Sequence, residues 1–460
     1  MTPIFKNKGS KVSLENWRPI SQISAFAKVI ELLMKNRLMS FLSTSEILSK
    51  AQHGFLPELS IVTATTSLTN YIYEQLENNE KITGLFLDLS KAFQRVNHSI
   101  LLKKLYLLGV RGSASAWCES YLKGRYQTVE IPAVENGVIK SCMSECLNVT
   151  LGVPQGSILG PLFFLLYVND LSASFPEVFS VLYADDTSIL MKSSTALTHQ
   201  ASLDRLLDWF KFNKLSVNAS KTVRVEFQGR GVHHQWMNLK INDKMLTCHD
   251  SVKFLGIFID NKLSWSTHIS YICKRLASIC FMLRQLRYRV SMETLKKVYY
   301  SNFYSIMKYG IEFWGTSCGW EQVFVLQKKA IRIINGREWD AQLGHPPSCR
   351  SIFEKHEMLT MPCSFILETI CSVLKSDAPT FEEIHHHATR RQNDFILSSH
   401  RTHRYSKSVN YMGAKLFNQL PRLVKQSRHL NNFKVVLKRF LIKHEFYSLE
   451  EYLNHTCTCT

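Results

Sequence analysis

The sequence predicts an α+β fold for the first part of the chain and a mostly helical fold for the rest. Short apolar segments with the length of buried strands, near 81–90, 222–228 and 252–259, alternate with amphipathic helical patterns. Beyond about residue 266, long basic helical patterns such as HISYICKRLASICFMLRQLRYR take over. With 460 residues and 45% apolar content, the chain can bury more than one core.

These changes of pattern predict three regions. The first spans residues 1–260, and the helical pattern that follows defines a second region at 261–340. The segment NGREWDAQLGHPPS interrupts that pattern, so residues 341–460 form a third, basic region whose role the pattern does not indicate. No internal repeat is visible.

Charge points to a polyanionic partner. Lys and Arg number 56 against 37 Asp and Glu, which gives a formal net charge of +19. Such an excess is typical of proteins that bind nucleic acid. The alternative is a basic protein that binds nothing acidic.

The sequence favours an intracellular, reducing location, in the nucleus, the cytoplasm or both. It opens MTPIFKNKGSK, which has no apolar core of the kind a secretory signal needs. The most apolar stretch, Ile158–Val168, is too short to span a bilayer and contains Gly160 and Pro161. Twelve cysteines without a regular spacing are not typical of a secreted disulfide framework. We therefore expect neither secretion nor a membrane partner.

Helical periodicity recurs in the first region. Residues 13–43 repeat apolar side chains three and four positions apart, and residues 61–78 and 91–109 show similar patterns, the last one closed by Gly109. We expect a helix over each of these ranges.

The segment VLYADDTSIL (181–190) predicts a strand, a tight turn and a second strand. One interpretation is a polar hairpin tip. A third carboxylate, Asp88 at the end of the apolar strand GLFLD, favours another, because carboxylates among apolar neighbours need a neutralising cation. Carboxylates and phosphates are the ligands that Mg²⁺ prefers. Asp88, Asp185 and Asp186 therefore predict a site for phosphoryl transfer with two such ions.

Several motifs together resemble a known family. FLDLSKAF, GVPQGSILGPLFFLLYVNDL and YADD occur in the order and spacing found in reverse transcriptases of non-LTR retrotransposons, especially jockey-like LINE elements. NWRPISQISAFAKVIE, NKLSVNASKT and VKFLGIFID match further motifs of that family. The resemblance implies a right-hand polymerase, with α+β fingers and palm around a small antiparallel sheet, a helical thumb and a basic C-terminal helical region. It also implies RNA-directed DNA synthesis.

The resemblance implies a metal site and a catalytic acid. Asp88, Asp185 and Asp186 would bind two Mg²⁺ ions, which Mn²⁺ could replace. Lys221 matches a palm lysine proposed to protonate the departing pyrophosphate. Taken alone, Lys221 has the ordinary interpretation of a surface lysine.

The resemblance also implies a substrate-binding set. Phe93 matches the bulky residue that selects deoxynucleotides by excluding a 2′-hydroxyl, although it also suits a helix core. Pro154, Gln155 and Gly156 match the loop along template and nucleotide; without the family they are an ordinary helix-entry loop. Arg18 matches a fingers residue that could reach triphosphate or template.

Two positions depart from the family pattern. Gln94 replaces the aspartate of AFD, which loses a charge, and Leu56 replaces the arginine that follows GF, which loses a phosphate donor. Both changes support a second hypothesis, a catalytically decayed copy that retains only nucleic-acid binding. The intact aspartate set argues against it.

By the same resemblance, the expected partners are an element RNA as template, a DNA primer at a target site, and deoxynucleoside triphosphates. Members of the family carry an endonuclease domain before the fingers, and nothing in this sequence resembles one. The chain is therefore expected to be an N-terminally truncated copy.

Overall fold

The computed structural model describes residues 1–135, 137–193, 198–229, 238–336, 348–376, 378–381, 393–429 and 432–455. The chain divides into two compact units. The first comprises Met1–Thr65, Ile82–Glu226 and Gly231–His249; the second comprises Thr66–Lys81, Phe227–Arg230 and Asp250–Thr460. The division of the chain into three regions remains a prediction, and its second boundary lies mostly outside the described residues.

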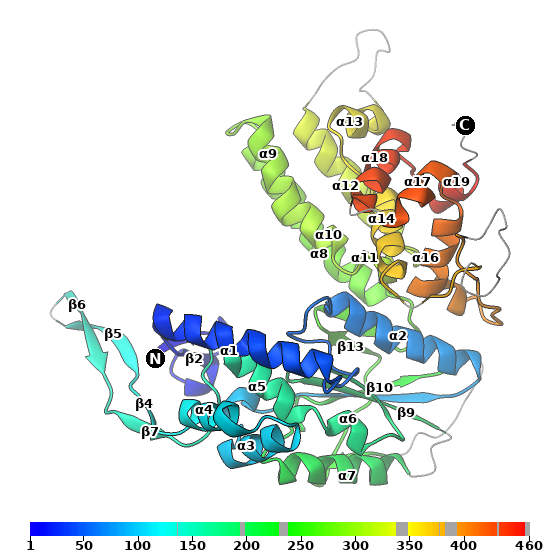
Figure 1. The fold of residues 1–460 in the computed structure, drawn as a ribbon. Helices are drawn as coiled ribbons and strands as arrows, with labels where there is room; N and C mark the ends of the chain where they lie inside the picture. Colours follow the sequence, from blue (N-terminus) through cyan, green and yellow to red (C-terminus); the bar gives the residue numbers. More distant parts are fainter. Residues whose placement is uncertain are drawn as a thin grey trace. The chain divides into compact units, whose positions relative to one another are not determined.

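The first unit mixes helices and short strands (Figure 1). Its elements are β1 (Thr2–Phe5), η1 (Leu14–Asn16), β2 (Trp17–Ile20), α1 (Ala25–Thr44), β3 (Ile82–Leu87), η2 (Ala92–Gln94), α3 (His98–Leu107), α4 (Gly112–Leu122), β4 (Arg125–Gln127), β5 (Glu130–Glu135), β6 (Val138–Met143), β7 (Leu147–Val149), α5 (Leu159–Val168), α6 (Leu171–Ser174), β8 (Phe179–Tyr183), β9 (Asp186–Lys192), α7 (His199–Phe212), β10 (Val223–Phe227), β11 (Lys240–Ile241) and β12 (Lys244–Met245). Helix α2 (Ile61–Glu77) has residues in both units.

A four-stranded sheet in the order β10-β3-β9-β8 forms the centre of the first unit. Strand β9 pairs antiparallel with both β3 and β8. All six residues of β3 are buried, which explains its unbroken apolar sequence ITGLFL. The pairing of these strands fixes where the residues that follow β3 and β8 leave the sheet.

Helix α5 crosses the core of this unit and packs against α1 and α3. Its helical residues are buried with the exception of Pro161, so its first backbone N–H groups have no access to water. Glu31 of α1 supplies the cap: its Oε2 accepts hydrogen bonds from the N–H groups of Ile158 (2.6 Å) and Leu159 (3.3 Å). The buried carboxylate fixes the start of α5 and hence the loop that leads into it.

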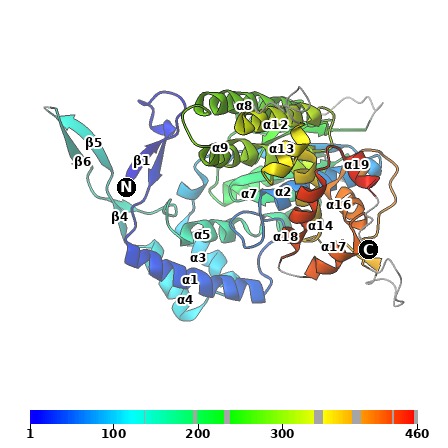
Figure 2. The ribbon, with the colours of Figure 1, turned by 90° about the horizontal axis from the view of Figure 1, so that it is seen from above.

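The hairpin of β5 and β6 projects from the first unit, and both views show it (Figures 1 and 2). Its strands pair from Glu130↔Met143 to Glu135↔Val138. Exposed apolar side chains at its base, Ile131 and Met143, make no large core. The hairpin adds surface to the unit without contributing to its centre.

The second unit is mainly helical. After the hairpin of β13 (Ser251–Phe254) and β14 (Ile257–Asp260) it contains α8 (Ser266–Leu286), α9 (Met292–Val298), the π-helix η3 (Tyr299–Tyr304), α10 (Ser305–Lys308), α11 (Ile311–Trp314), α12 (Trp320–Asn335), α13 (Cys349–Lys355), α14 (Met361–Val373), η4 (Tyr405–Lys407), α16 (Val409–Asn418), α17 (Arg422–Gln426), η5 (Ser427–His429), α18 (Phe433–His444) and α19 (Leu449–Leu453). None of the helices in the described part of the chain is long and apolar enough to cross a membrane.

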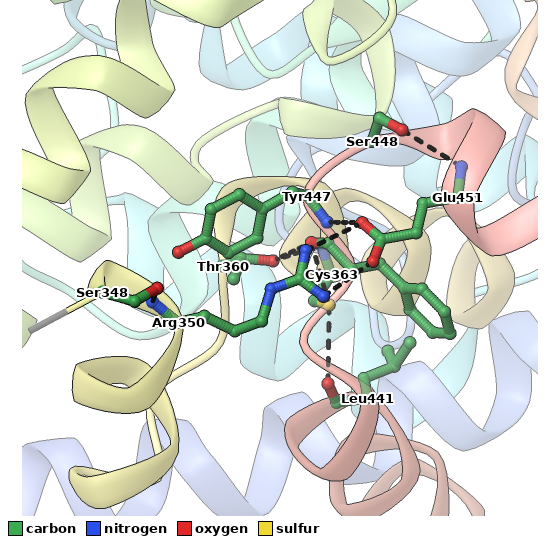
Figure 3. Close-up of polar contacts among 9 residues, drawn as sticks. Ser348, Arg350, Thr360, Cys363, Leu441, Tyr447, Ser448 and Glu451 are labelled. Atoms are coloured by element: carbon green, nitrogen blue, oxygen red, sulfur yellow. Dashed lines mark hydrogen bonds and ion pairs between the residues drawn. The ribbon is translucent and has the colours of Figure 1, made fainter.

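A polar network joins α13 and α14 to α18 and α19 in the second unit (Figure 3). The Arg350 guanidinium binds both carboxylate oxygens of Glu451, at 2.8 and 3.3 Å, and lies 4.5 Å from the centre of the Tyr447 ring. Glu451 also accepts the N–H of Tyr447 at 2.7 Å. The Cys363 thiol donates to the carbonyl of Leu441. The charges of Arg350 and Glu451 are paired with each other, so the contact has a structural character.

The structure confirms the predicted helix at 61–78 as α2 and the predicted hairpin at 181–190 as β8 and β9. The helix predicted over 13–43 is wrong at its start, because Trp17–Ile20 pairs with Thr2–Phe5 as a strand and only α1 is helical. The helix predicted over 91–109 is also too long. Its first part forms the short turn η2, and α3 begins only at His98.

Candidate active site

The paired aspartates lie at the tip of the β8–β9 hairpin. Tyr183 pairs with Asp186, so Ala184 and Asp185 form a two-residue turn between them. Ala184 has a left-handed backbone (φ 56°), which is uncommon for a residue with a Cβ atom. The local strain shows that surrounding contacts hold this turn in place.

Asp88 reaches the same end of the sheet from β3. Leu87 pairs with Thr187, and continuing that register by one residue brings Asp88 opposite Asp186. The next segment of chain is fixed too, since the Asp88 carbonyl accepts the N–H of Asn218 (2.8 Å) and Leu89 pairs with Val217. Three carboxylates from two parts of the chain therefore gather at one edge.

Lys221 lies three residues beyond Asn218, which is held against Asp88. A tight turn from Asn218, in which Lys221 N–H donates to the Asn218 carbonyl, carries the lysine back toward Asp88. Its Nζ lies 3.5 Å from Asp88 Oδ2. The two side chains are 68% and 39% exposed, so this ion pair is screened by water and weak.

The carboxylates repel one another. Partial desolvation, together with the charges of Asp185 and Asp88, raises the pKa of Asp186 to about 6, although its side chain reaches solvent. Desolvation and the charge of Asp88 also raise the pKa of Asp185, against the opposing charge of Arg18. Within the described residues, the site has more negative than positive charge and would gain from an added cation.

Arg18 lies on β2 with an exposed side chain. It is close enough to Asp185 to lower that residue's pKa, but no ion pair forms between them in the described part of the chain. The strand β2 also continues into a contact with the loop before α5, because Ser21 N–H donates to the Gln155 carbonyl at 2.8 Å.

That loop carries Pro154, Gln155 and Gly156. Gly156 has φ 104°, and a Cβ atom there would lie 3.1 Å from the Ser21 carbonyl oxygen, so glycine lets the loop approach β2. Gln155 is half-buried. The structure thus brings this loop beside Arg18's strand.

Phe93 is half-buried in η2, with its ring 4.7 Å from that of Phe164 on α5. Its carbonyl accepts the N–H of Val153, which joins η2 to the loop. The packing supports the interpretation as a core residue and leaves part of the ring exposed.

A cavity of about 430 Å³ opens beside the same loop. Gln94, Arg125, Tyr126 and Gln155 are among the residues that line it. Gly152 makes the close approach of the loop to Gln94 possible, because a Cβ there would lie 2.8 Å from the Gln94 carbonyl oxygen. The departure from the family pattern at residue 94 therefore lies at the wall of a cavity.

Asp88, Asp185 and Asp186 supply carboxylate oxygens, which are suitable ligands for a divalent cation. Among the described residues, no three His, Cys, Asp or Glu side chains form a closed group around one point. Mg²⁺ usually takes only one or two carboxylates and completes its shell with water and substrate phosphates. Desolvation and mutual repulsion raise the pKa values of Asp185 and Asp186, and a bound cation would offset both effects.

Sequence reasoning missed Gln52. No pattern in the sequence singles out this residue, yet the Gln52 side chain is buried against the turn that carries Asp185. A buried glutamine between Ala51 and His53 has no local signal, because its partner lies 132 residues away.

An α+β unit with three acidic residues at one end of a small, largely antiparallel sheet, followed by a helical region, is the architecture of a right-hand polymerase. Comparison with known families gives the more specific assignment. The model of the family "Reverse transcriptase (RNA-dependent DNA polymerase)" matches residues 5–259. The chain belongs to the reverse transcriptase family.

Sequence similarity to individual proteins supports the same family. The chain is 27% identical over 361 residues to the RNA-directed DNA polymerase from mobile element jockey of Drosophila melanogaster, and 30% identical over 350 residues to the probable RNA-directed DNA polymerase from transposon BS of the same species. These matches cover 73% and 72% of this chain. The chain spans only 37% of the length of either relative.

Solved structures give a weaker likeness. A telomerase from Candida albicans, in complex with a fragment of telomeric RNA, matches 68% of this chain and 57% of its own at 13% identity, with a TM-score of 0.37. A telomerase from Candida tropicalis in a similar complex matches 91% of this chain and 56% of its own at 12% identity, again with a TM-score of 0.37. The fold assignment rests on the family match.

Proposed function

We propose that this chain is an RNA-directed DNA polymerase, in which the 3′-hydroxyl of a DNA primer attacks the α-phosphate of a deoxynucleoside triphosphate paired to an RNA template. The observation that carries the proposal is the gathering of Asp88, Asp185 and Asp186 at one sheet edge with raised pKa values for the last two. The relatives are named for the same activity. The family they share with this chain supports RNA, primer DNA and nucleotides as its partners.

The three aspartates would hold two Mg²⁺ ions, or Mn²⁺ in their place. Bound divalent cations would lower the pKa of the attacking hydroxyl and stabilise charge on the transferred phosphoryl group. Asp185 would contribute charge from the strained turn, Asp186 from the first position of β9, and Asp88 from the position after β3. The protein's part is to fix these carboxylates in place before the substrate arrives.

Lys221 is proposed as the acid that protonates the departing pyrophosphate. Its ammonium lies beside Asp88 and is largely exposed, so it is free to reach a triphosphate. Arg18, on β2, would bind the triphosphate or the template. Phe93 would contact the sugar with the exposed part of its ring, and Pro154, Gln155 and Gly156 would line the template and nucleotide path.

Primer extension tests the proposal directly. The full chain is given a poly(rA)/oligo(dT) template–primer with Mg²⁺, and incorporation is compared with that of Asp185→Ala. Loss of one metal-binding carboxylate is expected to lower the rate by about 1,000-fold. The matched control is Asp208→Ala, which removes an exposed aspartate from α7 and is expected to leave the rate unchanged.

The same assay separates the proposal from the decayed-copy hypothesis. A folded chain that binds the duplex but incorporates no nucleotide would contradict the polymerase function. Leu56→Arg combined with Gln94→Asp then shows whether the two departures are the cause, because they restore a phosphate donor and a charge. Incorporation that is equal in wild type and Asp185→Ala would contradict the assigned metal site.

A further inference from the structure

The residues before Phe55 run beside the outer strand of the sheet. Leu182 N–H donates to the Ala51 carbonyl at 2.8 Å, and His53 N–H donates to the Leu182 carbonyl at 2.8 Å. Gln52 and Leu182 thus form a parallel bridge. Backbone pairing fixes Gln52 two residues from the turn at the end of β8.

The Gln52 side chain closes over that turn. It is 2% exposed. Its Oε1 accepts two backbone hydrogen bonds, from Gly54 N–H at 2.8 Å and from Ala184 N–H at 3.1 Å. One amide oxygen therefore joins the segment 51–54 to the residue directly before Asp185.

The backbone conformation of Ala184 needs such a contact. Its left-handed backbone is unfavourable for a side chain with a Cβ atom. The two segments approach each other closely at Gly54, because a Cβ atom there would lie 2.6 Å from the Ala184 nitrogen. The close approach and the hydrogen bond act on the same strained residue.

The amide nitrogen of Gln52 does not take part in these contacts. Its Nε2 is buried and has no hydrogen-bond partner among the described residues. A buried donor without a partner lowers stability, and an apolar side chain of the same size would avoid this. The glutamine is therefore better suited to holding the turn through its oxygen than to filling the core.

We propose that Gln52 is a positioning residue of the active site, whose amide oxygen holds the Ala184–Asp185 turn in the conformation that binds a divalent cation. The role rests on the proposed function, because the turn needs this conformation only if Asp185 is a metal ligand. Partners of this kind, one step behind the ligands, commonly change metal affinity 10- to 100-fold when they are removed.

Two measurements on the full chain test the role. The variants are Gln52→Met, which keeps the volume but loses the acceptor, and Gln52→Asn, whose amide is one methylene too short. Hydrogen exchange of the peptide over 182–186, followed by mass spectrometry, is expected to become about tenfold faster in both variants, the size of one lost hydrogen bond. Mn²⁺ affinity, measured from the electron paramagnetic resonance signal of the free ion, is expected to fall about tenfold.

Gln327→Met is the matched control. It removes a fully buried glutamine whose amide donates to Tyr299 and to the Leu359 carbonyl. We expect it to lower the melting temperature while leaving Mn²⁺ affinity and exchange at 182–186 unchanged. Gln52→Glu retains an oxygen acceptor and is expected to restore slow exchange.

The outcomes are distinct. Unchanged exchange in Gln52→Met, or in Gln52→Asn if the first variant does not fold, overturns the proposal. Faster exchange with unchanged Mn²⁺ affinity also overturns it, because the turn would then not matter to the metal. Wild-type protein that binds Mn²⁺ no better than Asp185→Asn overturns the metal site of the proposed function itself. The exchange data would still decide whether Gln52 holds the turn.

Discussion

Two clusters of charged side chains in this chain have opposite electrostatics. At Glu451, partial burial would raise the pKa, but hydrogen bonds from Arg350 and from the N–H of Tyr447 hold it below its ordinary value. At the β8–β9 turn, desolvation and neighbouring carboxylates raise the pKa of Asp186 to about 6. The first cluster is complete within the protein, whereas the second has an excess of negative charge.

The two clusters differ in whether the carboxylates have cationic partners close by. A carboxylate that stabilises the fold has its partners built in, as Glu451 has in Figure 3. The carboxylates at the β8–β9 turn have few such partners among the described residues, which lowers stability. Lys221, the one ion-pair partner seen in the described part of the site, is largely exposed and 3.5 Å from Asp88.

The largest expected effect is the response to a divalent cation. Mg²⁺ at about 100 times its dissociation constant should raise the free energy of unfolding by about 2.7 kcal/mol, because it binds only the folded carboxylate site. Thermal unfolding at pH 8, with matched ionic strength, measures it. The gain should decline as the pH falls below about 6, where Asp186 takes up a proton in place of the cation.

Asp185→Asn should abolish this response, and Asp208→Asn, on the exposed face of α7, should retain it. An equal Mg²⁺ response in wild type and Asp185→Asn would remove the contrast between the two clusters. The stabilising ion would then bind elsewhere.

Breaking the paired cluster should have the next largest effect. Glu451→Gln keeps the shape but removes the charge that binds Arg350, and is expected to lower the free energy of unfolding by about 1.5 kcal/mol at pH 7, a value reduced for solvent screening. Because the pKa of Glu451 is lowered in the fold, this stabilisation should disappear as the pH falls below about 4.5. Urea unfolding at pH 7 and pH 4 measures both values.

Glu450→Gln is the control, since Glu450 is exposed on the same helix α19. Primer extension by Glu451→Gln should equal that of wild type where the protein is folded. Slower primer extension by Glu451→Gln without a lower free energy of unfolding would show that this cluster has a role beyond stabilising the fold.

The sequence predicted the acidic hairpin because its signals are local. Strand-forming residues flank an Asp-Asp turn, and Asp88 ends an unbroken apolar strand, so both positions followed from short patterns. What the sequence could not show is pairing over distance. Lys221 reaches Asp88 only because residues 216–218 run beside 88–90. Gln52 reaches Ala184 across a comparable gap.

The errors in helix prediction have the same cause. Trp17–Ile20 lies within a helical pattern of apolar residues but forms a strand, because Thr2–Phe5 offers it a partner. Residues 92–96 are held by hydrogen bonds to the loop at 152–153, which prevents α3 from starting at Lys91. Tertiary contacts override local propensity in both segments.

The smallest expected effect concerns the excess charge itself. Asp186→Asn should raise the free energy of unfolding by about 1 kcal/mol at pH 8 without divalent cations, a value reduced for solvent screening. The sign follows from the raised pKa: folded Asp186 is harder to ionise than unfolded Asp186, so stability is lost as the pH rises from about 4 to about 6. The gain from Asn should therefore be complete above pH 6 and vanish toward pH 4.

Denaturation in EDTA at pH 8 and pH 4, with Asp208→Asn as the control, measures this gain. A substitution that stabilises the fold and yet abolishes primer extension would identify Asp186 as a residue kept for chemistry at the expense of stability. If Asp186→Asn instead destabilises the chain at pH 8, the carboxylate already has a partner, and the two clusters are alike.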